Sequence, residues 1–156
     1  MPVIKNETEK IGSVLTGVAG EYFVAAELSK RGYIASIILR NTRGIDILCS
    51  NSEASKSVNI QVKASSSPTR SWILNQKAED YFSNNFFYIF VNLNKRKEYP
   101  EFFIVPSEVV AKYCKKGHSH WLDTPGKNGQ KHKDTIMRKF DDPDEKYLNR
   151  WDFLNL

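Results

Sequence analysis

Residues 86–93 (FFYIFVNL) constrain the fold more than any other stretch, because seven of these eight residues are apolar. A strand at the edge of a sheet, or with one face in water, does not tolerate so many apolar and aromatic side chains. We therefore expect a central strand that is covered on both faces. The sequence predicts an α/β fold with layers on both sides of a sheet.

The pattern around this strand predicts the remaining elements. Residues 13–30 are expected to form a helix that Gly32 ends in the left-handed position. Strand-like runs at 33–39, 45–49 and 58–64 follow, and we expect a second helix at 75–82 and a strand at 102–105. A helix is predicted to open with Ser107 as N-cap and to end at Gly117, and a last short helix to begin at Asp142 and Pro143. The order α-β-β-β-α-β, with C-terminal additions, indicates a central mixed sheet flanked by helices, with the first hairpin antiparallel.

Length and composition indicate one domain. The chain has 156 residues, of which 40% are hydrophobic, enough for a single core. We expect one domain over residues 1–156, with a core at about 13–105 and additions at 106–156. No apolar run approaches the roughly 18 residues of a membrane span, and the first ten residues lack a signal core. The expectation is a soluble cytoplasmic protein without a membrane partner, in which Cys49 and Cys114 stay reduced.

The hairpin formed by residues 45–49 and 58–64 has a geometry that follows from its turn. If the two strands fold symmetrically about Glu53 and Ala54, Asp46 falls opposite Gln61. Side chains alternate along a strand, so Gln61 and Lys63 share one face. Asp46, Gln61 and Lys63 are therefore predicted to form one polar patch.

The first helix is predicted to add a fourth member to this patch. At 100° per residue, Glu21 falls within an apolar stripe, and Glu27 points roughly the opposite way. The stripe consists of Val14, Val18, Ala25 and Leu28. A carboxylate on a packing face is costly unless it is paired or binds a metal, so Glu21 is the candidate.

Together these residues have the chemistry of metal-assisted phosphodiester hydrolysis. Asp46, Gln61 and Glu21 offer hard oxygen ligands for Mg²⁺ or Mn²⁺, and Lys63 offers an ammonium for the attacking water or for developing charge. Asp, Gln and Lys at such spacings also occur by chance in hairpins, and Asp46 also suits a turn or strand end. The position of Glu21 favours the functional interpretation.

Four short segments of the sequence resemble a known family. The segments GVAGE (17–21), RGY (31–33), GID (44–46) and QVK (61–63), with Leu28, are similar to the PD-(D/E)XK, or restriction-endonuclease-like, nuclease superfamily. Within it the pattern most resembles Holliday-junction resolvases and Mrr-like restriction enzymes. The resemblance covers roughly residues 13–65.

The resemblance implies a restriction-endonuclease-like core and a role for each site residue. Asp46 would be the central metal ligand, Gln61 would occupy the usual Glu position, Lys63 would be the catalytic lysine and Glu21 would complete the site. Two departures are the absence of a proline before Asp46 and the neutral Gln61, which weakens metal binding. The resemblance also implies a homodimer.

Charge indicates a polyanionic partner. The formal net charge is +5, and residues 112–139 hold eight basic residues against two acidic ones. This basic stretch is predicted either to contact phosphates or to be a solvated surface balanced by the acidic tail. Our candidates for contacts with DNA are Arg43, Ser65, Arg70, Lys127, Lys131 and Lys133.

The sequence thus predicts a metal-dependent endonuclease that cleaves DNA. One alternative is a catalytically inactive nuclease-fold protein that acts as a DNA-binding or protein-interaction module. A further alternative is a metal-free RNA-processing enzyme. A zinc site built from Cys114, His118, His120 and His132 is disfavoured, because C-x₃-H-x-H is no closed zinc pattern.

Overall fold

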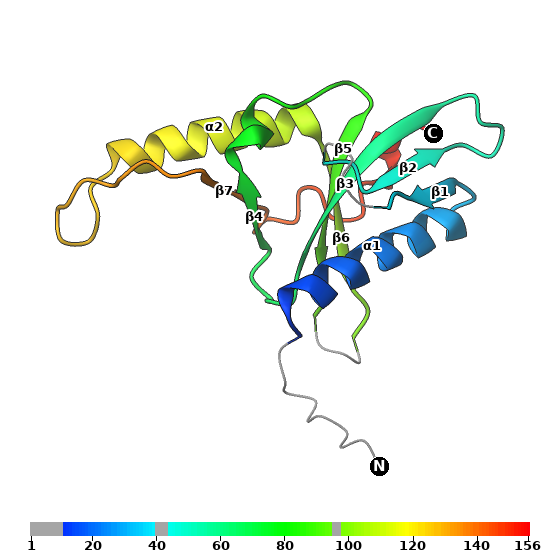
Figure 1. Cartoon of the computed structure of the whole chain (residues 1–156), viewed down its shortest axis with the longest axis horizontal. Coiled ribbons are helices and arrows are strands. Elements are labelled where there is room, and N and C mark those ends of the chain that lie inside the picture. The colour runs from blue at the N-terminus through cyan, green and yellow to red at the C-terminus, as the bar shows by residue number, and fades with distance from the viewer. Residues whose placement is uncertain (1–10, 40–43, 95–97) are drawn as a thin grey trace, which may run out of the picture.

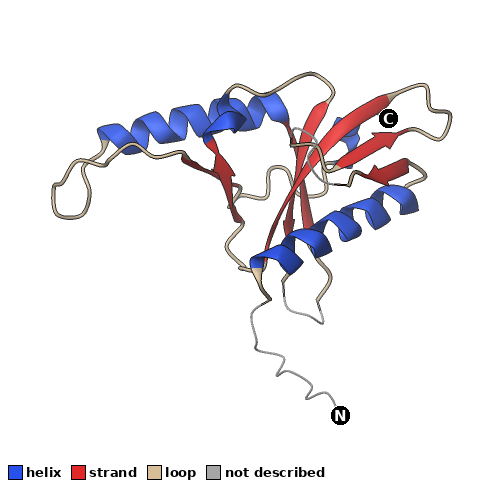
Figure 2. Cartoon of the chain, in the orientation of Figure 1, coloured by secondary structure: helices blue, strands red, loops and turns tan. Residues whose placement is uncertain are grey.

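The computed structural model describes residues 11–39, 44–94 and 98–156. A five-stranded sheet forms the centre, with α1 on one side and α2 beside a small two-stranded sheet (Figures 1 and 2). In chain order the elements are α1 (Ser13–Lys30), β1 (Ile34–Ile37), β2 (Ile47–Ser50), β3 (Ser57–Ser65), β4 (Ser71–Asn75), the 3₁₀ helix η1 (Gln76–Glu79), β5 (Phe86–Asn92), β6 (Glu101–Pro106), α2 (Ser107–Asp123), β7 (Met137–Asp141) and the 3₁₀ helix η2 (Trp151–Leu154).

The central sheet has the strand order β1-β2-β3-β5-β6 and is mixed. The pairs β1–β2, β2–β3 and β5–β6 are antiparallel, and β3–β5 is parallel. In the β2–β3 hairpin Ile47 pairs with Ile60, so the same register places Asp46 opposite Gln61. The predicted mixed sheet, the antiparallel first hairpin and its register are therefore confirmed.

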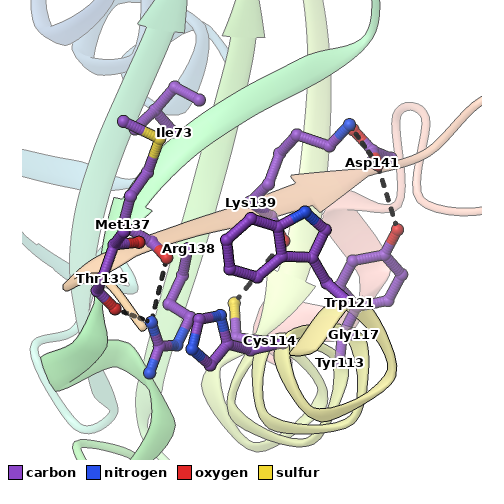
Figure 3. Close-up of a pocket in the computed structure, with 11 residues that line it drawn as sticks. Ile73, Tyr113, Cys114, Gly117, Trp121, Thr135, Met137, Arg138, Lys139 and Asp141 are labelled. Carbon is purple, nitrogen blue, oxygen red and sulfur yellow. Dashed lines mark hydrogen bonds and ion pairs between the residues drawn. The ribbon is translucent and has the colours of Figure 1, made fainter. Parts of the chain in front are cut away.

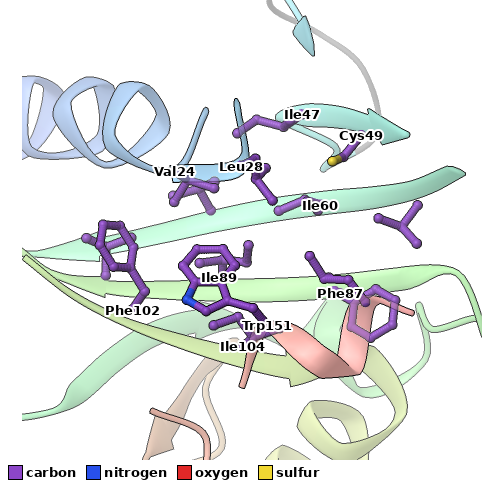
Figure 4. Close-up of a cluster of buried hydrophobic side chains, with 14 of the residues drawn as sticks. Val24, Leu28, Ile47, Cys49, Ile60, Phe87, Ile89, Phe102, Ile104 and Trp151 are labelled. Carbon is purple, nitrogen blue, oxygen red and sulfur yellow. The ribbon is translucent and has the colours of Figure 1, made fainter. Parts of the chain in front are cut away.

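Strand β5 lies inside the sheet, between β3 and β6, and all seven of its residues are buried. Side chains on alternate positions enter two separate hydrophobic clusters. One cluster packs under α1 and η2 and includes Val24, Leu28, Ile60, Ile89 and Trp151 (Figure 4). The other lies toward α2, β4 and β7. The predicted two-sided burial of this strand is confirmed.

Several elements after β3 differ from the predicted ones. Residues 71–75 and 137–141 form strands β4 and β7, which pair with each other, and neither was predicted. The helix predicted at 75–82 is only the 3₁₀ turn η1. No last helix begins at Pro143; instead the Asp142 carboxylate accepts hydrogen bonds from the backbone N–H groups of Lys146 and Tyr147, which stabilises a turn. Local propensity missed both strands because their partner is distant in sequence.

Helix α2 also differs from its prediction. It continues past Gly117 to Asp123, because a glycine inside a helix lowers its stability without ending it. Ser107 is the first helical residue and not the N-cap; its hydroxyl donates to the Ser83 carbonyl oxygen at 3.0 Å. No helix in the described part of the chain has both the length and the apolar character needed to cross a membrane.

Helix α1 has the predicted bounds, and Gly32 has the predicted positive φ of 87°. Its predicted packing face was correct at Ala25 and Leu28, which pack on the core, and wrong at the N-terminal end. Val14 and Val18 are exposed, and the buried residues are Thr16, Gly20, Val24, Glu27 and Leu28. The helix approaches β3 so closely at Gly20 that an added Cβ would lie 2.5 Å from the Ala64 Cβ. This contact fixes how α1 sits over the sheet.

Candidate active site

The candidate site lies at an open edge of β3. Strand β2 pairs with β3 only as far as Ile47 and Ile60, whereas β3 continues to Ser65 beside β5. At the point where the two strands separate, the Asp46 carboxylate takes the place of a backbone acceptor. The Val62 N–H donates to Asp46 Oδ2 at 2.7 Å. Asp46 is thereby fixed at the edge through one of its carboxylate oxygens.

Backbone contacts hold Asp46 on both sides. Its N–H donates to the Ile60 carbonyl oxygen at 2.8 Å, and its own carbonyl oxygen accepts from the Ile38 N–H at 2.9 Å. Burial raises the pKa of the Asp46 carboxyl, while the Val62 N–H and the nearby Lys63 charge act in the opposite direction. Desolvation outweighs these two stabilising contacts, so the carboxylate lacks a sufficient counter-charge in the protein alone.

Glu21 approaches Asp46 from α1. Burial and then the negative charge of Asp46 raise the pKa of the Glu21 carboxyl. Glu21 lies beside the packing face of the helix and is half-buried. The structure therefore places Glu21 within electrostatic range of Asp46. The predicted reason, a central position in an apolar stripe, was wrong. The tight packing of the neighbouring Gly20 on β3 places Glu21 there.

Gln61 and Lys63 leave β3 on the face opposite α1. Val62 and Ala64 contact Gly20 of the helix, so the alternating residues point the other way. The Gln61 amide lies against Gly44, where an added Cβ would be 3.5 Å from the amide nitrogen. Gly44 has a φ of 73°, a conformation that favours glycine. The candidate site thus spans the edge of the sheet, and Asp46 is electrostatically coupled to Glu21 on one side and to Lys63 on the other.

Glu27, set aside in the sequence analysis, is the more buried helix carboxylate, at 5% exposure. It accepts hydrogen bonds from the Tyr99 hydroxyl and from the Arg31 guanidinium, the latter at 3.3 Å. These two donors compensate its burial, so Glu27 has a structural role. Spacing along the helix is compatible with the Glu27–Arg31 pair, but local rules do not predict the burial of Glu27, because Tyr99 is 72 residues away along the chain.

The predicted DNA contacts next to β3 have different surroundings. Ser65 Oγ accepts the Ser67 N–H at 3.0 Å, which organises the turn after the strand. The Arg70 guanidinium forms ion pairs with Glu101 at 3.1 Å and with Glu145 at 2.5 Å. Two carboxylates neutralise Arg70, which favours a structural role. Arg43 lies outside the described residues.

Beyond the three lysines on α2, the basic stretch at 112–139 divides into two groups. Lys127, Lys131 and Lys133 are exposed on the loop between α2 and β7, which projects away from the central sheet (Figure 1). Arg138 is buried and pairs with Glu79, and Lys139 pairs with Asp141 at 3.2 Å. The charges on the loop are thus available to solvent, whereas the two basic residues of β7 are paired with carboxylates, Arg138 in the interior and Lys139 at the surface.

A separate pocket of about 430 Å³ lies between α2 and β7 (Figure 3). The residues of the disfavoured zinc site are divided there: Cys114 is buried with its thiol toward the Lys139 carbonyl oxygen, and His118 hydrogen-bonds Asp134 at 2.7 Å. The rings of Trp121 and His132 stack at 4.1 Å. Across residues 11–39, 44–94 and 98–156, no three His, Cys, Asp or Glu side chains gather as a metal site would require.

Comparison with known proteins identifies a solved structure with a similar fold. No protein-family model matches the sequence, and no curated protein matches it. Among solved structures, the bacterial homing endonuclease I-Ssp6803I has a similar fold, with a TM-score of 0.55 and 14% sequence identity over 94% of each chain. At this identity the similarity concerns the fold alone. The chain therefore has a mixed α/β fold that is also found in an endonuclease.

Proposed function

We propose that this protein is a metal-dependent endonuclease that hydrolyses DNA phosphodiester bonds, and that it is a PD-(D/E)XK nuclease. The observation that carries the proposal is the position of Asp46 at the open edge of β3, coupled to Glu21 and to Lys63. Two carboxylates and one ammonium around a sheet edge can bind a cation and a phosphate together. The fold similarity to a homing endonuclease supports the same class.

The donor set fits Mg²⁺ or Mn²⁺. Asp46 and Glu21 would contribute carboxylate oxygens, and Gln61, which leaves β3 on the other face, would contribute its amide oxygen around the open edge of the strand. Mg²⁺ in proteins commonly takes one or two carboxylates and fills its remaining positions with water and phosphate. The raised pKa of both acids indicates that their charges lack compensation, which a divalent cation would provide. When bound, the cation would neutralise the phosphate and lower the pKa of a bound water.

The side chains of the chain itself would position the reactants. The Val62 N–H holds one oxygen of Asp46 and so fixes its orientation. The Lys63 ammonium would hold the attacking water or stabilise negative charge that develops on the phosphate oxygens. The exposed Lys127, Lys131 and Lys133 would contact the DNA backbone outside the site. Ser65, Arg70 and Arg43 stay predictions, as does the homodimer, which sedimentation analysis would test.

A catalytically inactive nuclease-fold protein is the second candidate, and two observations favour it. Gln61 replaces a carboxylate, and the described residues include no cluster of three acidic, His or Cys side chains. Weak metal affinity would leave a DNA-binding or protein-interaction module. The two candidates differ in whether purified protein cleaves DNA.

The test is cleavage of supercoiled plasmid and of branched DNA by purified protein in Mg²⁺ or Mn²⁺, with and without chelator. We expect nicking that the chelator abolishes. Asp46→Asn should abolish metal binding and cleavage, whereas Lys63→Met should bind metal in calorimetry and lose the chemical step. Chelator-resistant cleavage of RNA would instead identify a metal-free RNA-processing enzyme. Absence of cleavage with every metal and substrate would leave the inactive module.

A further inference from the structure

An open pocket of about 770 Å³ adjoins the candidate active site. Gln61 and Lys63 form part of its wall, and so does Gly44, which lies two residues before Asp46. In the register of the β3–β5 pair, Tyr88 lies directly beside Gln61 and extends the same wall of the pocket. A group bound in this pocket would therefore lie next to a phosphate held at Asp46 and Lys63.

The lining of the pocket is mainly apolar with a few polar groups. Leu74, Ala78 and the aromatic rings of Tyr81 and Tyr88 form the apolar part, and Asn75, Lys77 and Asp80 form the polar part. Tyr81 is 43% exposed, so its ring is accessible. Pockets of about 300–1,000 Å³ with this composition typically bind small organic ligands, whose orientation the polar groups fix.

The polar groups offer both kinds of hydrogen-bond partner. Asn75 Oδ1 already accepts the Lys77 N–H at 3.1 Å, which leaves the amide nitrogen of Asn75 as a donor. The Asp80 carboxylate is an acceptor, and the Lys77 ammonium is a cation close to it in sequence. A donor, an acceptor, a cation and an exposed aromatic ring together match the base and phosphate of a nucleotide.

We propose that this pocket binds one unpaired nucleotide of the strand to be cut, with its base stacked on Tyr81. The proposal rests on the proposed function, since continuity with the phosphodiester site selects a nucleotide over other flat ligands. A base inside a duplex is paired and stacked, and it must leave the helix before it enters a recessed pocket. The preferred substrate class is therefore DNA with an unpaired nucleotide beside the scissile phosphate, as in single strands, flaps, branches and mismatches.

The experiment measures binding without cleavage. A short single-stranded oligodeoxynucleotide carrying 2-aminopurine is titrated with the full chain in chelator, and the duplex of the same sequence is the competitor. Variants are Tyr81→Ala, Tyr81→Phe and the matched control Phe82→Ala. Phe82 is the next residue, has a similar exposure of 48%, and does not line the pocket. Melting curves confirm that each variant is folded.

We expect stacking to quench 2-aminopurine, and Tyr81→Ala to remove the quenching and weaken single-strand binding by about 5- to 150-fold. Tyr81→Phe and Phe82→Ala should stay within about 2-fold of the wild type. The duplex should compete poorly. Equal effects of Tyr81→Ala and Phe82→Ala, or duplex binding as tight as single-strand binding, would overturn the proposal, as would no DNA binding at all.

The result is separable from the proposed function because no metal is present. Cleavage in Mg²⁺ combined with insensitivity of binding to Tyr81→Ala would overturn the pocket and leave the endonuclease. Tyr81-dependent binding without cleavage in any metal would overturn the endonuclease and leave a single-strand-binding protein.

Discussion

Two carboxylates on α1 provide the sharpest test of the candidate site, because substitution by Gln removes the same charge from each. Glu21 is coupled to Asp46 at the site, whereas Glu27 is buried beneath Tyr99 and Arg31. Glu21→Gln should therefore reduce cleavage and leave folding intact. Glu27→Gln should reduce stability and leave cleavage intact.

The magnitude for Glu27 follows from its two hydrogen bonds. Hydrogen bonds to a buried charged group contribute roughly 1.5–3 kcal/mol, and a Gln side chain keeps one oxygen for Tyr99 or Arg31. We therefore expect Glu27→Gln to lower the free energy of unfolding by about 1.5–3 kcal/mol. For a chain of this size that corresponds to a fall in Tm of roughly 3–12 °C.

The expectation for Glu21 is the opposite. Its raised pKa shows that the charged form is disfavoured in the folded protein without metal, so Gln should maintain or raise Tm in chelator. Loss of the negative charge of this ligand should lower the rate of cleavage by about 100-fold or more. The two variants should thus change different quantities.

The assay is plasmid nicking in Mg²⁺ together with thermal melting in chelator, on the same preparations. Nicking rates are compared at a temperature well below the Tm of either variant. If Glu27→Gln reduced nicking as much as Glu21→Gln while both stayed folded, the assignment of Glu21 to the site would be refuted. A large loss of stability in Glu21→Gln would refute it equally.

Three further predictions concern the metal, the pH and the DNA. Gln61→Glu adds a carboxylate and should tighten Mg²⁺ binding in calorimetry by about 10-fold; unchanged affinity would remove Gln61 from the metal site. The pKa values of Glu21 and Asp46 are raised in the folded protein, so their contribution to stability without metal should be largest below about pH 4 and should fall as the pH rises. Mg²⁺ should raise Tm only above that pH range, where the two carboxyl groups ionise. An equal effect of Mg²⁺ on Tm at pH 4 and at pH 8 would contradict this. Charge reversal of Lys131 and Lys133 to Glu should weaken binding to all DNA sequences alike and flatten its salt dependence, and no change would identify the loop as a solvated surface.

Local sequence rules were sufficient for the first hairpin. The alternation of apolar residues and a turn centred on Glu53 and Ala54 predicted the register that the structure has, and with it the position of Asp46 opposite Gln61. Positive φ at Ala54, 54°, is consistent with a tight connection at this turn. Register could be predicted because a shift of one residue would expose the buried side of both strands.

The packing face of α1 could not be predicted in the same way. Val14 and Val18 follow the helical period and are nevertheless exposed, while the charged Glu27 is buried. The deciding contact is the approach of Gly20 to Ala64, where the absence of a side chain allows the helix to lie against β3. Apolar periodicity does not detect such a contact, because it depends on which surface meets the helix.

The sequence alone determined the central strand at 86–92, the first hairpin and the identity of the polar residues along it, since these depend on neighbours close in the chain. Only the tertiary structure decided that β3 runs beyond β2 and so leaves an edge for Asp46, that β4 pairs with β7, and that Tyr88 lies beside Gln61. Those arrangements arise from strand pairing and helix packing between distant segments. Their energies depend on side-chain fit and burial, which a local pattern does not contain.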